Sequence, residues 1–144
     1  MATSDSAVAR VAVVACTKAK LRRRAPAIEM YSPSPLFQKS CDQARAEGLP
    51  IVILSTKYGL VDAQEVIDPY ERTFAAMTPT ERQEWDRLVA DQVATLCEGQ
   101  SLKEVVFFAG TEYRNSVQPL FAARGVATRV HPRWRAICDE VFGG

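Results

Sequence analysis

The chain has 144 residues, of which 47% are hydrophobic, and its formal net charge is +1. A chain of this length fits one domain with one core, and a charge this close to zero excludes a protein that binds nucleic acid through an overall basic field. Any contact with nucleic acid must therefore come from a local patch. The one clear basic run, equally well explained as a solvated loop, contains Lys18, Lys20, Arg22, Arg23 and Arg24.

The four cysteines and the single histidine, His131, form no C-x-x-C pair or other closely spaced set. Structural zinc sites need such sets, so we expect no metal, and no cofactor is indicated. No apolar stretch approaches the length that crosses a membrane, and the first ten residues lack the apolar core of a signal peptide. We therefore expect reduced cysteines in a cytoplasmic protein with no membrane partner. The sequence indicates no oligomeric state.

We expect residues 1–9 to be a flexible terminus and residues 10–144 to form a single α/β domain. Short apolar, β-branched runs predict four buried strands at Val11–Ala15, Ile51–Leu54, Val105–Phe108 and Val126–Val130. Helices are predicted at Leu36–Glu47, between Thr78 and Gly99, at Glu112–Ala123 and at Trp134–Phe142. This alternation predicts a three-layer fold, with a central, mainly parallel four-stranded sheet and helices on both faces.

Local signals define some of the boundaries between these elements. Ser34 followed by Pro35 is typical of a helix start, and Thr78-Pro79-Thr80-Glu81 contains a complete capping box. Lys57–Leu60 is predicted to be a turn in which Gly59 takes a positive φ angle. The segment Val61–Phe74 is predicted to be an irregular excursion.

A polar cluster follows the first predicted strand and contains Cys16, Thr17, Lys18 and Lys20. Backbone amides, the Thr17 hydroxyl and either ammonium group suit an oxyanion. The spacing is neither that of a Walker loop nor that of a dinucleotide fingerprint. Cys16 is a candidate nucleophile, or else a small buried residue at a strand end. The distant His131 gives little support to a Cys–His pair, and we interpret it as a bystander.

Two further clusters follow the second and third predicted strands. Ser55, Lys57 and Tyr58 offer a hydroxyl, a cation and a ring that stacks on a base or sugar, although Tyr58 is equally suited to packing on Leu60. The other cluster opens a helix, where anions are favoured, and contains Gly110, Tyr113 and Arg114. We expect these residues to contact a phosphate or a carboxylate. The alternative is that Arg114 is an exposed first-turn residue, and the anionic Glu112 disfavours phosphate.

The loop Asp68-Pro69-Tyr70-Glu71 carries two carboxylates on either side of a Pro-Tyr pair. Asp68 and Glu71 are the candidate catalytic residues, since a rigid loop with a carboxylate near an aromatic ring suits water activation or binding of a sugar hydroxyl. Tyr70 is a second candidate for stacking on a base. Alternatively, both carboxylates pair with Arg72. Trp134, near the end of the chain, is expected to pack against the core.

Because ligands of open α/β sheets bind beyond the carboxyl ends of the strands, we expect these clusters to form one crevice. Their order resembles that of a family of small, uncharacterised bacterial and phage domains. The resemblance rests on Cys16–Leu21, Ala25–Ala27 with Tyr31, Leu36-Phe37, Ile53–Val61, Val66–Thr73 and Ala109–Arg114. That family is similar to YaaA-like peroxide-stress proteins and to domains of archaeosine synthase and 7-deazaguanine transglycosylases, with a sheet like that of uracil-DNA glycosylases.

The resemblance implies a protein that handles a nucleotide, a modified nucleobase, or DNA or RNA. Many relatives end in a Gly-rich tail that contains Gln, whereas this chain ends in His131-Pro132-Arg133-Trp134-Arg135 and onward. From the clusters and the resemblance together, we expect an enzyme acting at a base–sugar (N-glycosidic) bond, either an N-glycosidase or a base-exchange enzyme. The alternatives are a nucleic-acid-binding module without catalysis, related to the response to DNA damage or peroxide stress, and an accessory protein that binds a small metabolite.

Overall fold

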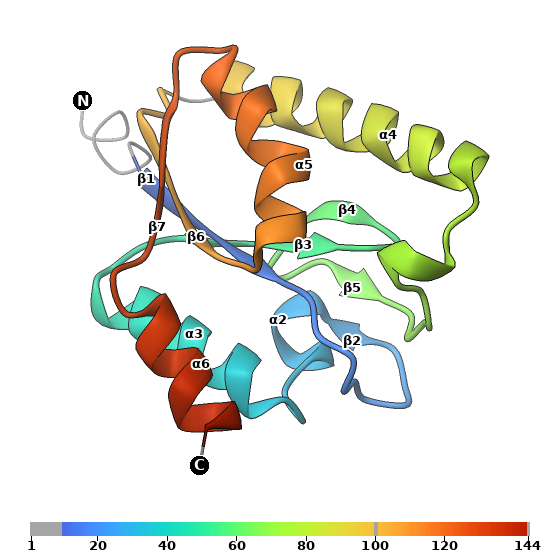
Figure 1. Cartoon of the computed structure of the whole chain (residues 1–144), viewed down its shortest axis with the longest axis vertical. Coiled ribbons are helices and arrows are strands. Elements are labelled where there is room, and N and C mark those ends of the chain that lie inside the picture. The colour runs from blue at the N-terminus through green and yellow to red at the C-terminus, as the bar shows by residue number, and fades with distance from the viewer. Residues whose placement is uncertain (1–9, 100, 144) are drawn as a thin grey trace.

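The computed structural model describes residues 10–99 and 101–143, so the predicted flexible terminus at residues 1–9 lies outside the described residues. The central sheet has five strands in the order β4-β3-β1-β6-β7 (Figure 1). These strands are β1 (Arg10–Ala15), β3 (Ile51–Ser55), β4 (Gly59–Asp62), β6 (Glu104–Phe108) and β7 (Ala127–Val130). The helices are α2 (Ala27–Met30), α3 (Pro35–Ala46), α4 (Pro79–Glu98), α5 (Thr111–Ala122) and α6 (Trp134–Phe142).

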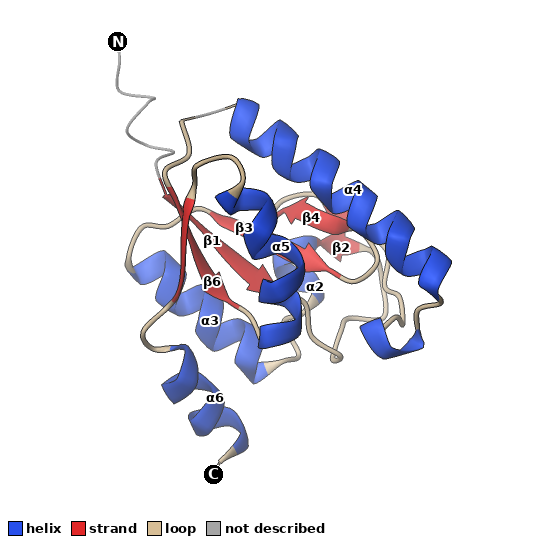
Figure 2. Ribbon diagram, turned by 45° about the horizontal axis from the view of Figure 1, so that its top comes forward, coloured by secondary structure: helices blue, strands red, loops and turns tan. Residues whose placement is uncertain are grey.

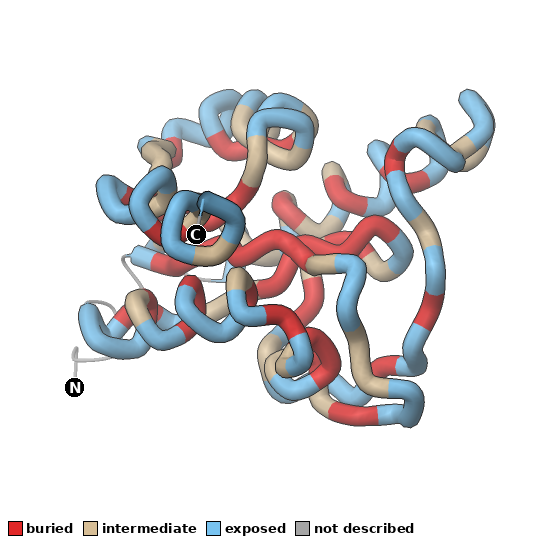
Figure 3. Tube along the Cα trace, turned by 60° about the horizontal axis from the view of Figure 1, so that its bottom comes forward, coloured by how far each residue is buried: buried red, intermediate tan, exposed pale blue. Residues whose placement is uncertain are grey.

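Helices cover both faces of this sheet, which confirms the predicted three-layer α/β fold (Figure 2). Side chains alternate along β1, so Ala12 and Val14 face α3 and α6, while Val11 and Val13 face α4 and α5. Both sets are buried, and a strand that is covered on both sides needs a continuous apolar run. Figure 3 shows the resulting pattern, with the buried trace inside and the exposed residues on the outer helix faces.

The prediction of four strands is incomplete, because β4 adds a fifth. β4 runs antiparallel to β3, with Ser55 opposite Gly59, whereas the pairs β3–β1, β1–β6 and β6–β7 are parallel. Gly59 has a φ of 73°, as predicted, and this closes the hairpin. The predicted irregular excursion also contains β5 (Val66–Ile67), which pairs with β2 (Ala25–Pro26) in a separate two-stranded sheet. A run of two residues is too short to give a periodic signal.

The predicted helix starts are confirmed by their hydrogen bonds. The Ser34 hydroxyl accepts from Phe37 N, and the Thr78 hydroxyl accepts from Glu81 N while the Glu81 carboxylate accepts from Thr78 N. These caps satisfy amides that have no partner within the helix. They fix the start of α3 and the start of α4, which pack on opposite faces of the sheet.

Parallel pairing of β3, β1 and β6 places their carboxyl ends at one edge of the sheet. The chain leaves these ends through the segments that begin at Cys16, Thr56 and Ala109. These are the segments that carry the three polar clusters. The fold therefore brings together loops that are distant in sequence.

Candidate functional site

A cavity of about 340 Å³ lies at this edge of the sheet, and we call it the polar pocket. Its wall is formed by the segment after β1, by the segment that precedes the 3-10 helix at Phe74–Ala76, and by the first turn of α5. The lining residues are Cys16, Thr17, Lys18, Lys20, Glu71, Arg72, Thr73 and Tyr113. Six of the predicted site residues therefore meet around one cavity, with cations, hydroxyls and one carboxylate available to a ligand.

Lys20 is held in the wall of the polar pocket by contacts within the protein. Its ammonium group lies 4.6 Å from the centroid of the Tyr70 ring and donates to the Lys18 carbonyl at 3.2 Å. Partial burial lowers the pKa of Lys20 below its ordinary value, while electrostatic interactions with Cys16 and Glu71 act in the opposite direction. An ammonium group that has already lost part of its water interacts more strongly with an incoming anion.

A second cavity, of about 480 Å³, shares Lys18, Lys20 and Glu71 with the polar pocket. It continues along Arg22, Pro69 and Tyr70. Lys18, Lys20 and Glu71 therefore separate two adjoining hollows. A ligand longer than a single phosphate group can contact these three side chains from either side.

Cys16 is buried beside two hydroxyl groups. Its sulfur lies 3.4 Å from Tyr113 Oη and 3.9 Å from Thr56 Oγ1, and the Thr56 hydroxyl donates to the Arg72 carbonyl at 2.7 Å. Burial, followed by the negative charge that a Cys16 thiolate would carry, raises the pKa of Tyr113, so its phenol stays protonated at neutral pH. Cys16 is thus a positioned thiol at the floor of the polar pocket.

Ser55 was predicted to bind substrate, but its hydroxyl is occupied inside the protein. The residue is fully buried, and its oxygen accepts from Lys57 N at 3.0 Å and from Tyr58 N at 2.9 Å. Two donors fill both lone pairs, so the Ser55 proton is directed at Tyr70 Oη, 2.7 Å away. Tyr70 Oη in turn lies 2.6 Å from Tyr31 Oη. Burial raises the pKa of both phenols, which keeps this network protonated.

Asp68, Lys57 and Tyr58 lie outside the lining of the two cavities. The Asp68 carboxylate is 61% exposed and lies 3.2 Å from Arg24 Nε. Lys57 is exposed, with its ammonium group 5.2 Å from the Tyr58 ring, and the Tyr58 hydroxyl donates to the Asp68 carbonyl. Tyr58 meets Tyr70 edge-on, at 5.5 Å between ring centroids. The second predicted cluster therefore flanks the site through Tyr70.

Arg114 also differs from its predicted role. Its guanidinium donates to the Ala109 carbonyl and to the Thr111 hydroxyl, both at 3.0 Å, and so it stabilises the turn between β6 and α5. Gly110 does line a cavity, but a different one from the polar pocket.

That further cavity, of about 210 Å³, is not predicted from the sequence, and we call it the aromatic pocket. Its side chains come from the ends of β1 and β6 and from α3, α5 and α6. Its lining includes Phe37, Ser40, Phe108, Trp134, Cys138 and Phe142, together with Cys16, Thr17 and Tyr113, which it shares with the polar pocket. No single segment carries this combination, so no local sequence signal marks it.

His131 is buried and structural, in agreement with its interpretation as a bystander. Its Nδ1 accepts from Arg133 N at 3.0 Å, so Nε2 carries the proton that is donated to Glu47 Oε2 at 2.6 Å. The ring stacks on Phe108 at 4.7 Å. These contacts fix the turn that leads into α6 and hence the position of Trp134.

A remaining cavity of about 330 Å³ lies between β4 and α4, away from the polar clusters, and its charged lining residues are Asp62 and Asp91. Across the described residues we find no group of three or more His, Cys, Asp or Glu side chains that could hold a metal ion. None of the described helices is both long and apolar enough to cross a membrane.

Comparison with known proteins gives one informative result. No curated protein and no solved structure matches the chain significantly. The profile of one protein family, described as a family of unknown function (DUF6884), matches residues 11–133, which include all the lining residues of the polar pocket. The chain therefore belongs to the DUF6884 family.

Proposed function

We propose that this protein binds a nucleotide, or a nucleoside with a modified base, in the polar pocket and acts on its base–sugar bond. The observation that carries the proposal is the arrangement of Thr17, Lys18, Lys20 and Glu71 around one cavity at the carboxyl ends of the strands. Two cations and a hydroxyl suit a phosphate, while a carboxylate in the same cavity suits chemistry at the sugar.

Glu71 is the better of the two candidate carboxylates, because it lines both polar cavities, whereas Asp68 is paired with Arg24 outside them. In the proposed hydrolysis, Glu71 takes a proton from a water molecule, whose oxygen bonds to the anomeric carbon. The C–N bond breaks, and the base leaves with the bonding electron pair and takes up a proton. The carboxylate also stabilises the positive charge that develops on the sugar.

The motifs resemble those of a family that is similar to domains of archaeosine synthase and 7-deazaguanine transglycosylases, and this resemblance supports action on a base, including exchange of one base for another. In an exchange reaction, the nitrogen of an incoming base takes the place of water at the anomeric carbon. The residues that hold the sugar and phosphate are the same in both reactions. Chromatography distinguishes the two, because hydrolysis yields a free sugar phosphate and exchange yields a new nucleotide.

The test is incubation of the purified protein with ribo- and deoxyribonucleoside monophosphates, with and without added 7-deazaguanine bases, followed by chromatography of the released base. We expect Glu71→Gln to lower the rate by about 100-fold or more. The matched control is Glu65→Gln, at an exposed position in the turn between β4 and β5. The proposal fails if the wild-type protein neither binds nor cleaves any compound in this panel.

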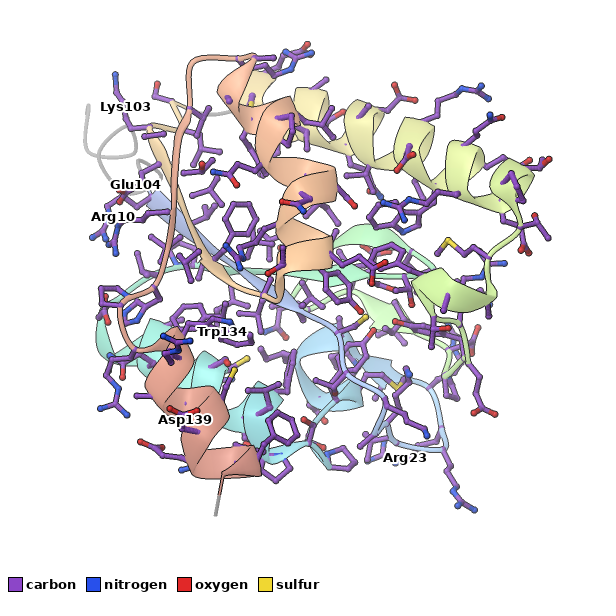
Figure 4. All side chains as sticks on the ribbon, in the orientation of Figure 1. Arg10, Arg23, Lys103, Glu104, Trp134 and Asp139 are labelled. Carbon is purple, nitrogen blue, oxygen red and sulfur yellow. The ribbon has the colours of Figure 1, made fainter. Side chains whose placement is uncertain are left out.

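A second candidate function, binding of single-stranded or damaged DNA without catalysis, is supported by the basic run beside the site. Arg22 lines the second cavity, and the exposed Arg23 projects away from the body of the protein (Figure 4). Phosphate contacts from these side chains predict affinity that falls steeply with salt. Arg23→Ala should reduce this salt dependence, and Lys103→Ala, at the opposite end of the sheet, should not. Affinity that is independent of salt would exclude this candidate.

A further inference from the structure

We propose that the aromatic pocket binds the planar base of the nucleotide whose phosphate is held in the polar pocket. This inference rests on the proposed function and assigns base recognition to α3 and α6. The sequence had suggested Tyr58 or Tyr70 for this role. However, the Tyr70 hydroxyl is bonded to Ser55 and its ring is covered by Lys20, while Tyr58 lies outside the polar pocket.

The aromatic pocket and the polar pocket adjoin. Cys16, Thr17 and Tyr113 line both of them, so a molecule that contacts Lys18 or Lys20 on one side is close to the aromatic pocket on the other. One pocket is charged and the other is almost wholly apolar. A nucleotide has a similar division, with a charged phosphate at one end and, at the other, a flat base whose ring faces stack on aromatic side chains.

The walls of the aromatic pocket contain several aromatic rings. Phe37 and Phe108 are buried, and Trp134 and Tyr113 are partly buried, so ring surfaces reach the cavity from four different elements or element ends. Rings of this kind bind flat heterocycles by offset or edge-to-face contact. Phe142, at the end of α6, also lines the cavity although it is 73% exposed, which leaves one side of the pocket at the protein surface.

The aromatic pocket also contains a polar group without a hydrogen-bond partner among the described residues. Ser40 lines the aromatic pocket and is only 1% exposed, yet its hydroxyl has no hydrogen-bond partner in the part of the chain that the structure describes. A helical serine usually donates to the carbonyl four residues earlier, and this bond is not formed here. Buried hydroxyls without partners are unfavourable, so each calls for an explanation. The carbonyl or amino edge of a bound base would supply the missing partner.

Hydrogen bonds within the protein hold the part of the aromatic pocket that α6 forms. Trp134 N donates to the His131 carbonyl at 2.9 Å, and the His131 ring is held by Glu47 and by Arg133 N. Figure 4 shows Trp134 at the end of α6 that meets the sheet. These hydrogen bonds hold the start of α6, and with it Trp134, in place.

The experiment compares ligands with and without a base, by calorimetry at equal ionic strength. The probes are AMP, GMP, CMP, UMP and ribose 5-phosphate. We expect at least one nucleotide to bind about tenfold more tightly than ribose 5-phosphate. Ser40→Ala should weaken that nucleotide about five- to tenfold and leave ribose 5-phosphate unchanged. Because Ser40→Ala removes an unpaired hydroxyl, the melting temperature should stay the same or rise.

A second variant blocks the pocket instead of removing the hydroxyl. Cys138 is partly buried in α6 and lines the pocket, so Cys138→Trp should fill the space and abolish the advantage of the nucleotide over ribose 5-phosphate. Ser101→Ala, at an exposed position before β6, is the matched control and should change neither ligand.

The outcomes separate the two proposals. If ribose 5-phosphate and the nucleotides bind equally, or if both pocket variants leave the preference intact, the assignment of the aromatic pocket is wrong and the proposed function stands. If neither kind of ligand binds the wild-type protein, the proposed function fails and this inference fails with it. If Ser40→Ala lowers the melting temperature by several degrees, the hydroxyl has a partner within the protein, and it is not available to a base.

Discussion

Replacing Ser55 with alanine tests whether this hydroxyl organises the site from within. The side chain is fully buried and makes three hydrogen bonds, two from the amides of Lys57 and Tyr58 and one to Tyr70 Oη. Ser55→Ala removes all three and leaves these groups without their partner. The substitution deletes a single oxygen atom, so lost packing contributes little.

The size of the effect follows from these bonds. An internal hydrogen bond contributes about 0.5–1.5 kcal/mol net, and an unsatisfied buried group costs about 1–3 kcal/mol. The two amides lie in a turn beside the exposed Lys57 and regain some contact with water, so we expect a total loss of about 2–4 kcal/mol. For a domain of this size, about 3 °C of melting temperature corresponds to each kcal/mol, which gives a fall of about 6–12 °C.

The assay is urea unfolding followed by tryptophan fluorescence, supported by calorimetric melting. Trp85 is a suitable probe, because its indole N–H donates to the Ser55 carbonyl at 2.9 Å. Ser40→Ala and Ser101→Ala are the matched controls, one with a buried but unpaired hydroxyl and one with an exposed side chain. A change of less than about 0.5 kcal/mol in Ser55→Ala, equal to an ordinary surface substitution, would refute the reasoning.

Three further predictions concern the fold and the polar pocket. Gly59→Ala should destabilise the protein by at least about 2 kcal/mol in urea unfolding, because Gly59 has a φ of 73°. The added Cβ also collides with Gln92 Oε1, which is held by Leu60 N. An unchanged unfolding midpoint would contradict this prediction. Thr78→Ala should cost about 1 kcal/mol in the same assay, since it removes the cap of α4, and Thr78→Ser should restore the loss. Burial holds the pKa of Lys20 below its ordinary value of 10.5, so its charge is lost at lower pH than that of a free lysine. The affinity for ribose 5-phosphate, measured by calorimetry, should therefore begin to fall at lower pH in the wild type than in Lys20→Arg. Identical pH profiles would exclude Lys20 as an anion ligand.

The layers of this fold were predictable because strong local signals and burial agree. β1 is apolar on both faces because it lies in the middle of a covered sheet, and the capping box at Thr78 marks the start of α4. β4 was missed because its burial alternates over only four residues, and its identity depends on pairing with β3. β2 and β5 have two residues each and are stabilised by contacts between segments about forty positions apart.

The sequence predicts which polar side chains reach the candidate site, because the strand ends determine their position. It does not predict which of them are free to bind a ligand, because that depends on hydrogen bonds within the fold. Thr17, Lys18 and Lys20 follow β1 directly, so the parallel sheet alone brings them to the edge where Tyr113 lies. Ser55 follows the same rule, but its hydroxyl is consumed by its own turn and by Tyr70. Sequence reveals which polar groups reach an edge, whereas only the partners reveal which of them remain free.

The same distinction explains why two carboxylates three residues apart have different surroundings. Tyr70 lies between them, and its hydroxyl is anchored to Ser55 and Tyr31 in the interior. Both carboxylates are exposed, but Glu71 lies in the wall of the polar pocket, whereas Asp68 lies outside it beside Arg24. The buried network therefore anchors the loop between a carboxylate that lines the polar pocket and one that does not.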